Sequence, residues 1–104
     1  MAQETKIQNE IIKFLNQQGV FCWRNNNGSV YDTNLKQYRS FTGMKGVPDI
    51  ICVINGQFVG IEVKTPTGKQ SPDQLLFARR LEKNGGKYYL VRSVEEVKKL
   101  LTLV

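Results

Sequence analysis

Apolar residues near the start of the chain recur at the spacing of an α-helix. They predict a helix over residues 4–18, and the residues that would form its buried face are Ile7, Ile11, Phe14 and Leu15. Gly19 suits the position just after a helix C-terminus, where a left-handed backbone is common. The apolar run over residues 20–24 that follows predicts a short strand.

Two further apolar runs flank Asn55-Gly56. Asn-Gly between alternating hydrophobic residues indicates a hairpin with a two-residue type I′ turn. The pairs that this turn predicts are Ile54 with Gln57, Cys52 with Val59, Ile50 with Ile61, and Asp49 with Glu62. The register therefore brings two carboxylates together at the open end of the hairpin.

The second half of the chain predicts a helix, a strand and a helix. Ser71 is a suitable N-cap for a helix over residues 72–84, and residues 87–91 read as a strand. Ser93 and Glu96 form a capping-box pattern for the last helix. The fold class is therefore α/β, with a mixed β-sheet flanked by helices in the order α-β-β-β-α-β-α. We expect one domain over residues 1–104.

Residues 25–46 show no clear periodicity, and they begin with turn-forming residues at 25–29. Basic and aromatic residues alternate in this segment, a mixture that suits contacts with nucleic-acid phosphates and exposed bases. The other interpretation is a hairpin that covers the core, with Val30-Tyr31 and Tyr38-Arg39 as strand fragments. The two interpretations are compatible with each other.

Net charge and hydropathy indicate which classes of partner the protein binds. The net charge of +6 favours a polyanion, although many small basic proteins bind no nucleic acid. No apolar run approaches the ~20 residues of a membrane span and no apolar leader is visible, so we expect a cytoplasmic protein without membrane contact. The basic residues that we expect to contact DNA are Arg24, Lys36, Arg39, Lys45, Lys69, Arg79 and Arg80.

The chain has no histidine, which excludes Ser-His-Asp and Cys-His catalysis and histidine-ligated zinc. Its two cysteines, Cys22 and Cys52, lie in separate apolar stretches without a CxxC motif. We interpret both as small core residues rather than as a disulfide or a zinc site. Hydrolytic chemistry would have to use carboxylates, lysine and a hard metal ion.

The predicted hairpin supplies those groups. Glu62 and Lys64 are two residues apart in a strand and share a face, with Asp49 opposite Glu62. Opposed carboxylates repel each other, and a Mg²⁺ or Mn²⁺ ion between them would neutralise that repulsion. Glu10 lies at the edge of the apolar face of the first helix. Its side chain either reaches over the sheet or is exposed to solvent. Gln74, in the first turn of a later helix, is placed to hold Lys64 or a water molecule.

Pro48-Asp49, a short hairpin and Glu62-Val63-Lys64 resemble the PD-(D/E)xK nuclease motif. The downstream segments 69–75 and 85–96 closely resemble the VRR-NUC subfamily, and the likeness extends from Glu10 to the last helix. The resemblance implies a restriction-endonuclease-like core and metal-dependent hydrolysis of phosphodiester bonds. Because the chain is similar to small stand-alone enzymes of this type, the resemblance also implies a homodimer that cuts branched DNA, including four-way (Holliday) junctions.

The resemblance also implies a role for each matching residue. Asp49 and Glu62 would be metal ligands, joined by the backbone carbonyl of Val63 and by Glu10, directly or through water. Lys64 would be the catalytic lysine and Gln74 its helper. Two alternatives remain open: a nuclease for flaps, nicks or linear ends, and a DNA-binding module that does not cut. Each residue also has a purely structural interpretation. Asp49 could be a turn residue, Glu62 and Lys64 a charge pair on an edge strand, and Gln74 a surface residue of a helix.

Overall fold

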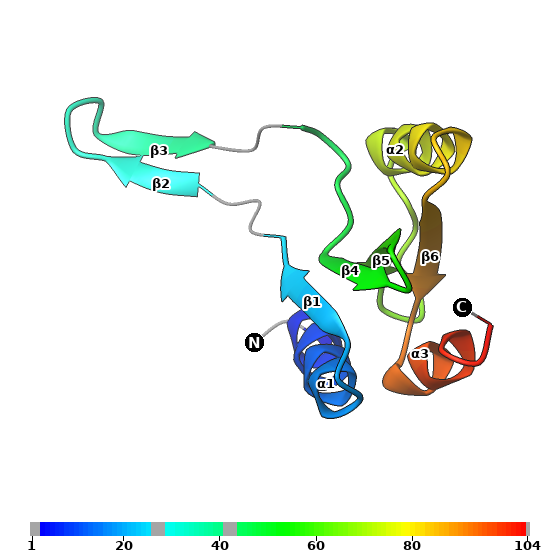
Figure 1. The fold of residues 1–104 in the computed structure, drawn as a ribbon. Coiled ribbons are helices and arrows are strands. Elements are labelled where there is room, and N and C mark those ends of the chain that lie inside the picture. Colours follow the sequence, from blue (N-terminus) through cyan, green and yellow to red (C-terminus); the bar gives the residue numbers. More distant parts are fainter. Residues whose placement is uncertain (1–2, 26–28, 41–43, 104) are drawn as a thin grey trace.

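The computed structural model describes residues 3–25, 29–40 and 44–103 (Figure 1). Its helices are α1 (Gln3–Gln17), α2 (Pro72–Lys83) and α3 (Val94–Leu100). Its strands are β1 (Phe21–Arg24), β2 (Ser29–Asp32), β3 (Gln37–Ser40), β4 (Ile50–Ile54), β5 (Gln57–Val63) and β6 (Lys87–Val91). The predicted helices and strands therefore form with ends that differ from the predicted ones by one or two residues.

The main sheet has four strands in the order β1-β4-β5-β6. The pairs β1/β4 and β4/β5 are antiparallel, whereas β5 and β6 are parallel and are joined through α2. This is the predicted mixed sheet, and its elements with the three helices follow the predicted order α-β-β-β-α-β-α. No helix in the described part of the chain is long and apolar enough to span a membrane.

The β4–β5 hairpin has the predicted turn and register. Asn55 has a φ of 52° and Gly56 a φ of 76°, as a type I′ turn requires. The observed pairs include Ile54 with Gln57, Cys52 with Val59, and Ile50 with Ile61. The alternation of faces along both strands is therefore fixed from the turn to the open end of the hairpin.

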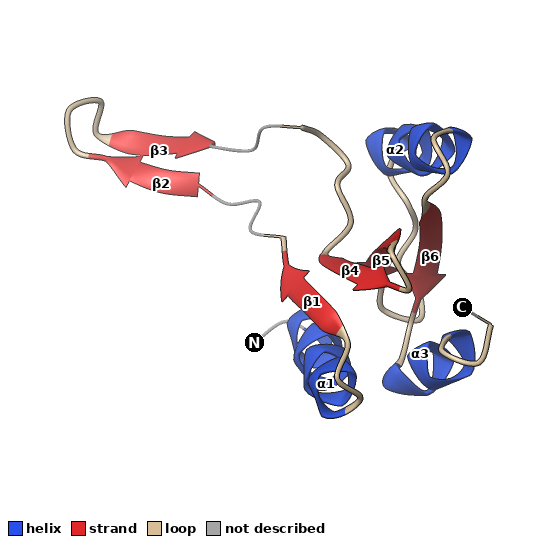
Figure 2. Cartoon of the chain, in the orientation of Figure 1, coloured by secondary structure: helices blue, strands red, loops and turns tan. Residues whose placement is uncertain are grey.

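The hydrophobic core lies between one face of the sheet and helices α1 and α3 (Figure 2). Its buried residues are Ile11, Leu15, Ile50, Cys52, Val59, Ile61, Val63, Val91 and Val97. On the other face, a side chain at Gly60 would contact Leu81 of α2 and Pro48. Residues on that face, which include the positions of Asp49 and Glu62, thus lie on the α2 side of the sheet.

The β2–β3 hairpin lies within residues 25–46, the segment for which the sequence allowed two interpretations. Its register pairs Val30 with Arg39 and Tyr31 with Tyr38, so the two expected strand fragments are confirmed. The hairpin forms a separate two-stranded sheet, and Figure 1 shows it projecting beside the main sheet. It therefore does not cover the core. The expected turn at 25–29 lies largely outside the described residues, since 26–28 are not among them.

The two cysteines are free thiols that lie opposite each other across β1 and β4. Cys52 is fully buried in the core and Cys22 packs against it half-buried. Burial, followed by the charge of Cys22, raises the pKa of Cys52 to about 12. Cys52 therefore stays protonated and serves as a small core residue.

Gly46 fixes the chain just before Asp49 against the start of α2. Its φ is +79°, and a Cβ there would lie 2.2 Å from the backbone oxygen of Asp73. We expect Gly46→Ala to lower the free energy of unfolding by several kcal/mol, because it combines left-handed strain with a backbone clash.

Gly19→Ala is the matched control, since Gly19 has a φ of +72° and open space where a Cβ would lie. It should cost about 1 kcal/mol, from the backbone strain alone. Urea denaturation of both variants measures the difference. Equal losses would show that the approach of residue 46 to α2 is unimportant for stability.

Candidate active site

Asp49 and Glu62 meet at the open end of the β4–β5 hairpin. Ile50 pairs with Ile61, so Asp49 and Glu62 stand one step further along the same ladder. The Oδ2 atom of Asp49 accepts a hydrogen bond of 2.8 Å from the backbone N–H of Val63. This bond holds the aspartate across the end of β5, beside the glutamate.

Glu62 is a buried acid. Its side chain is 1% exposed, and its Oε1 atom has no hydrogen-bond partner among the described residues. Burial, a hydrogen bond with Asp49 and the charge of Asp49 raise the pKa of Glu62 to about 9, against a smaller opposing effect of Lys64. Without a cation, Glu62 therefore holds a proton at neutral pH.

Lys64 follows directly on β5 and is half-buried. Its backbone N–H donates to the carbonyl of Val91 at 3.0 Å, which continues the parallel ladder with β6. Its positive charge lowers the pKa of Glu62, so its ammonium group lies close enough to act on the buried acid. Asp49, Glu62 and Lys64 are thus brought together.

Arg92 supports the loop that follows Lys64, a contact that the sequence did not reveal. Its guanidinium donates to the backbone oxygen of Thr65, and to that of Gly68 at 2.8 Å. A Cβ added at Gly68 would lie 3.5 Å from the side chain of Lys64. Arg92 therefore holds a turn that lies close to the stem of the lysine.

Two acids lie on α1: Glu10, the predicted metal ligand, and Glu4. Glu10 is exposed, and its charge is not among those that act on Glu62. The charge of Glu4 does raise the pKa of Glu62. Glu4 lies three residues before Ile7 and seven before Ile11, on the helix face that meets the sheet. This spacing from Ile7 and Ile11 is the sequence signal that could have pointed to Glu4.

Gln74 forms a helix cap and makes no hydrogen bond to Lys64 in the described part of the chain. Its Oε1 accepts from the backbone N–H of Ser71 at 2.9 Å, and its own N–H donates to Ser71 Oγ at 3.2 Å. This is the capping box of α2. Its predicted role as a helper of the lysine has no such contact to support it.

A different glutamine reaches the site through Tyr88. The Nε2 atom of Gln70 donates to the Tyr88 hydroxyl at 3.1 Å. Burial is the main cause that raises the pKa of Tyr88 to about 12; the Gln70 bond opposes it, and the charges of Glu62 and Asp49 add to it. Tyr88 precedes Leu90, the parallel partner of Glu62, by two residues and so shares its face. Sequence reasoning missed both residues because it did not continue the register onto β6.

The donor set suits a hard divalent cation. The described residues contain no group of three or more His, Cys, Asp or Glu side chains that could hold a metal ion. Mg²⁺, however, is commonly bound by one or two carboxylates with water and substrate phosphate completing its shell. A buried carboxylate oxygen of Glu62 that lacks a partner, next to Asp49, fits such an ion.

The predicted DNA-contacting residues are dispersed. The Arg24 guanidinium donates to Oδ1 of Asn9 on α1. Lys45 and Arg80 line one cavity of about 140 Å³ beside α2, with Met44 and Phe77. Lys36 and Lys69 are exposed in turns, Arg79 is exposed on α2, and Arg39 belongs to β3.

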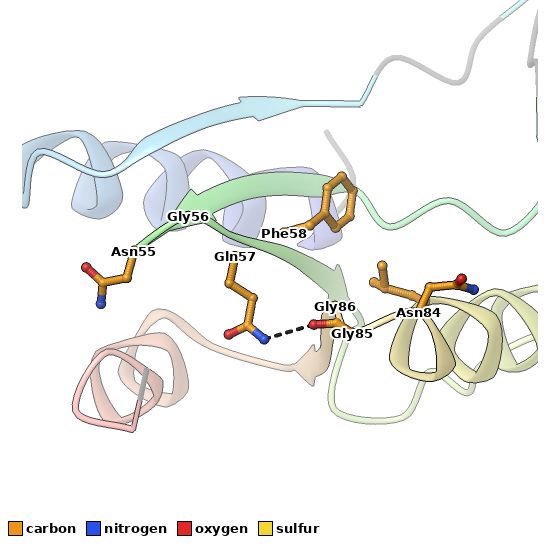
Figure 3. Close-up of a pocket in the computed structure, with 8 residues that line it drawn as sticks. Asn55, Gly56, Gln57, Phe58, Asn84, Gly85 and Gly86 are labelled. Carbon is orange, nitrogen blue, oxygen red and sulfur yellow. Dashed lines mark hydrogen bonds between the residues drawn. The ribbon is translucent and has the colours of Figure 1, made fainter.

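The cavity drawn in Figure 3 lies at the other end of the hairpin. Its volume is about 420 Å³, and it is formed around the Asn55-Gly56 turn and the end of α2. The Nε2 atom of Gln57 donates to the backbone oxygen of Gly85 at 3.0 Å across it. None of the site residues described above lines this cavity, so it does not mark the acidic site.

Comparisons with known proteins give one consistent result. The VRR-NUC domain family matches residues 2–95 of the chain. A solved structure described as a VRR_NUC domain superposes with a TM-score of 0.73 and 22% sequence identity, and the match covers 98% of this chain and 97% of the other. No curated protein matches the chain significantly in sequence. The solved structure shows the shared fold.

The buried acid predicts a pH-dependent stability. Because the folded pKa of Glu62 lies above its unfolded value of about 4.3, its contribution is fully present below pH 4 and is lost as the pH rises toward 9. In EDTA, Glu62→Gln should therefore gain stability over the wild type as the pH rises from 5 to 8. The change is at most about 1.4 kcal/mol per pH unit.

Urea denaturation at pH 5, 6.5 and 8 measures this difference. Glu82→Gln removes an exposed acid of α2 and should show no such trend. A constant difference between Glu62→Gln and the wild type across these pH values would contradict the raised pKa.

Proposed function

Because the chain belongs to the VRR-NUC family of nuclease domains, we propose that it is a Mg²⁺- or Mn²⁺-dependent endonuclease that hydrolyses phosphodiester bonds in branched DNA, such as four-way junctions. The observation that carries the proposal is Glu62. It is a buried acid with a carboxylate oxygen that lacks a partner among the described residues, beside Asp49 and Lys64. Such an arrangement is costly for folding and useful for binding a cation.

Asp49, Glu62 and the backbone carbonyl of Val63 would hold the ion. When bound, it would supply charge stabilisation on the phosphate and lower the pKa of a water molecule. The N–H of Val63 fixes one oxygen of Asp49, which leaves the carboxylate in a single orientation. Glu62 would hold the ion as a carboxylate, because metal ligands must be deprotonated.

The ammonium group of Lys64 would stabilise the negative charge that develops on the phosphate, or orient the attacking water. Arg92 acts as a positioning residue through the loop that it holds. The protonated Tyr88 hydroxyl, held by Gln70, would keep Glu62 in place. Glu4, whose charge acts on Glu62, would contact the ion through water, a role that the sequence had offered for Glu10.

The partner we propose is DNA, bound by a homodimer in the cytoplasm. The net charge of +6 supports attraction to the phosphate backbone. A two-fold dimer has two active sites, which suits paired cuts across a junction. Exposed lysines and arginines of the turns and of α2 would contribute non-specific phosphate contacts.

Cleavage assays test the activity directly. Asp49→Asn and Lys64→Ala should each lower single-turnover cleavage at least about 100-fold, because each removes charge at the reacting phosphate. The panel compares four-way junction, flap, nicked, linear duplex and single-stranded DNA in Mg²⁺ and in Mn²⁺, with native mass measurement of the oligomer. Preference for flaps or ends would redirect the substrate assignment.

Glu82→Gln is the control, since this exposed acid of α2 should have no effect on the rate. Cleavage by Asp49→Asn at the wild-type rate would falsify the assigned site.

The two acids of α1 provide a second test. Glu4→Gln should weaken Mn²⁺ binding and cleavage by about 10- to 100-fold, the range for residues that support a metal site. Glu10→Gln, the same change on an exposed position of the same helix, should leave both unchanged. Calorimetric Mn²⁺ titration and single-turnover rates give the two measurements. The reverse result would restore Glu10 as the metal-binding acid.

A further inference from the structure

Asn25 continues the β1/β4 ladder by one residue beyond the end of β1. Arg24 pairs with Ile50, and the N–H of Asn25 then donates to the backbone oxygen of Asp49 at 2.8 Å. Residues directly opposite each other in an antiparallel pair have Cβ atoms about 4.5–5.5 Å apart and point to the same face. Asn25 is therefore the neighbour of Asp49 on the side away from Glu62.

The three residues form a row across the sheet. Asn25 follows β1, Asp49 precedes β4 and Glu62 lies in β5, each one step along the same ladders. The row places one amide beside two carboxylates on the α2 side of the sheet. It adds to the acidic site a group with hydrogen-bond donors and no charge.

The side-chain nitrogen of Asn25 lacks a partner. Its Nδ2 atom is buried and makes no hydrogen bond in the described part of the protein. A buried donor left unpaired destabilises the folded protein, and such groups are rare. Asn25 and Glu62 supply the two buried side-chain atoms of this kind that the described residues contain, and both belong to the same row.

The strand face beside Asn25 is open to solvent. Trp23, two residues earlier on the same face, is 43% exposed, and Phe21 beyond it is 68% exposed. Their rings lie 5.2 Å apart, and α2 packs over the β5–β6 end of the sheet instead. Solvent-exposed strand surface therefore begins at Trp23, two residues from Asn25.

We propose that the Asn25 side-chain amide is a substrate-contacting residue that donates a hydrogen bond to a non-bridging oxygen of the bound phosphodiester. The inference rests on the proposed function, since it takes the nucleic acid as the ligand of the acidic site. An amide N–H can pair with a phosphate oxygen that two carboxylates would repel. The unpaired donor of the free protein is satisfied when DNA binds.

Asn25→Ala separates this role from a structural one. Removal of an unpaired buried polar group should leave the melting temperature unchanged or raise it. Loss of a hydrogen bond to a charged oxygen should weaken DNA binding and single-turnover cleavage by about 10- to 100-fold. Asn25→Asp, which replaces the donor by a like-charged acceptor of the same shape, should bind DNA at least as weakly as Asn25→Ala.

Asn84→Ala is the matched control. Its Nδ2 atom donates to the backbone oxygen of Arg80 at 2.8 Å, at the far end of α2 and beside the cavity of Figure 3. This variant should melt at a lower temperature, because it loses a satisfied cap, yet bind and cleave as the wild type does. The two asparagines thus have opposite expected effects on stability and on activity.

Three measurements decide the matter: thermal unfolding without metal, fluorescence anisotropy of a four-way junction in Ca²⁺, and single-turnover cleavage in Mg²⁺ or Mn²⁺. Wild-type binding and cleavage by Asn25→Ala would overturn the proposal. So would a large drop in its melting temperature that accounts for the lost activity. If the wild-type protein binds DNA but does not cut it, the proposed endonuclease activity is wrong. The comparison of Asn25→Ala with the wild type in Ca²⁺ then still tests whether Asn25 contacts DNA. Wild-type protein that binds no DNA would overturn both.

Discussion

The register of the β4–β5 hairpin is the constraint on which the site depends. A two-residue turn at Asn55-Gly56 fixes which residues face each other, and the side-chain period of two carries that choice to the open end of the hairpin. A slip of one residue would move Glu62 into the core and Ile61 out of it. The burial of Ile50, Val59 and Ile61 against α1 therefore also selects the position of the acids.

The same burial sets the electrostatics of the site. Glu62 is enclosed by the sheet and its neighbours, so its charged form is disfavoured until a cation is present. Around it, backbone donors and polar side chains fix the geometry: Val63 N–H on Asp49, Gln70 on Tyr88, and Arg92 on the loop after Lys64. Hydrogen bonds from several elements thus support the residues that surround Glu62.

Much of the fold could be predicted because its signals are local. Helical spacing, the Asn-Gly turn and the Ser71 and Ser93 caps gave the elements and the register of the hairpin. The tertiary placement of side chains was harder to predict. Glu10 was the predicted acid of α1 and is exposed, because the rotation of α1 on the sheet cannot be read from the edge of the helix's apolar face alone. Gln74 was given a chemical role although its side chain satisfies a helix end. Asn25 was considered only as the first residue of a turn, and its backbone N–H also pairs with Asp49.

The spread of the site along the chain has a consequence for how activity arises. Glu4 lies in the first turn of the first helix, whereas Tyr88 and Arg92 lie near the last helix, and β6 closes the sheet by parallel pairing with β5. Contacts this distant in sequence form late, after most of the loop-closure entropy has been lost. A chain still emerging from the ribosome lacks both β6 and Arg92, so the protein acquires its chemistry only with the last part of its sheet.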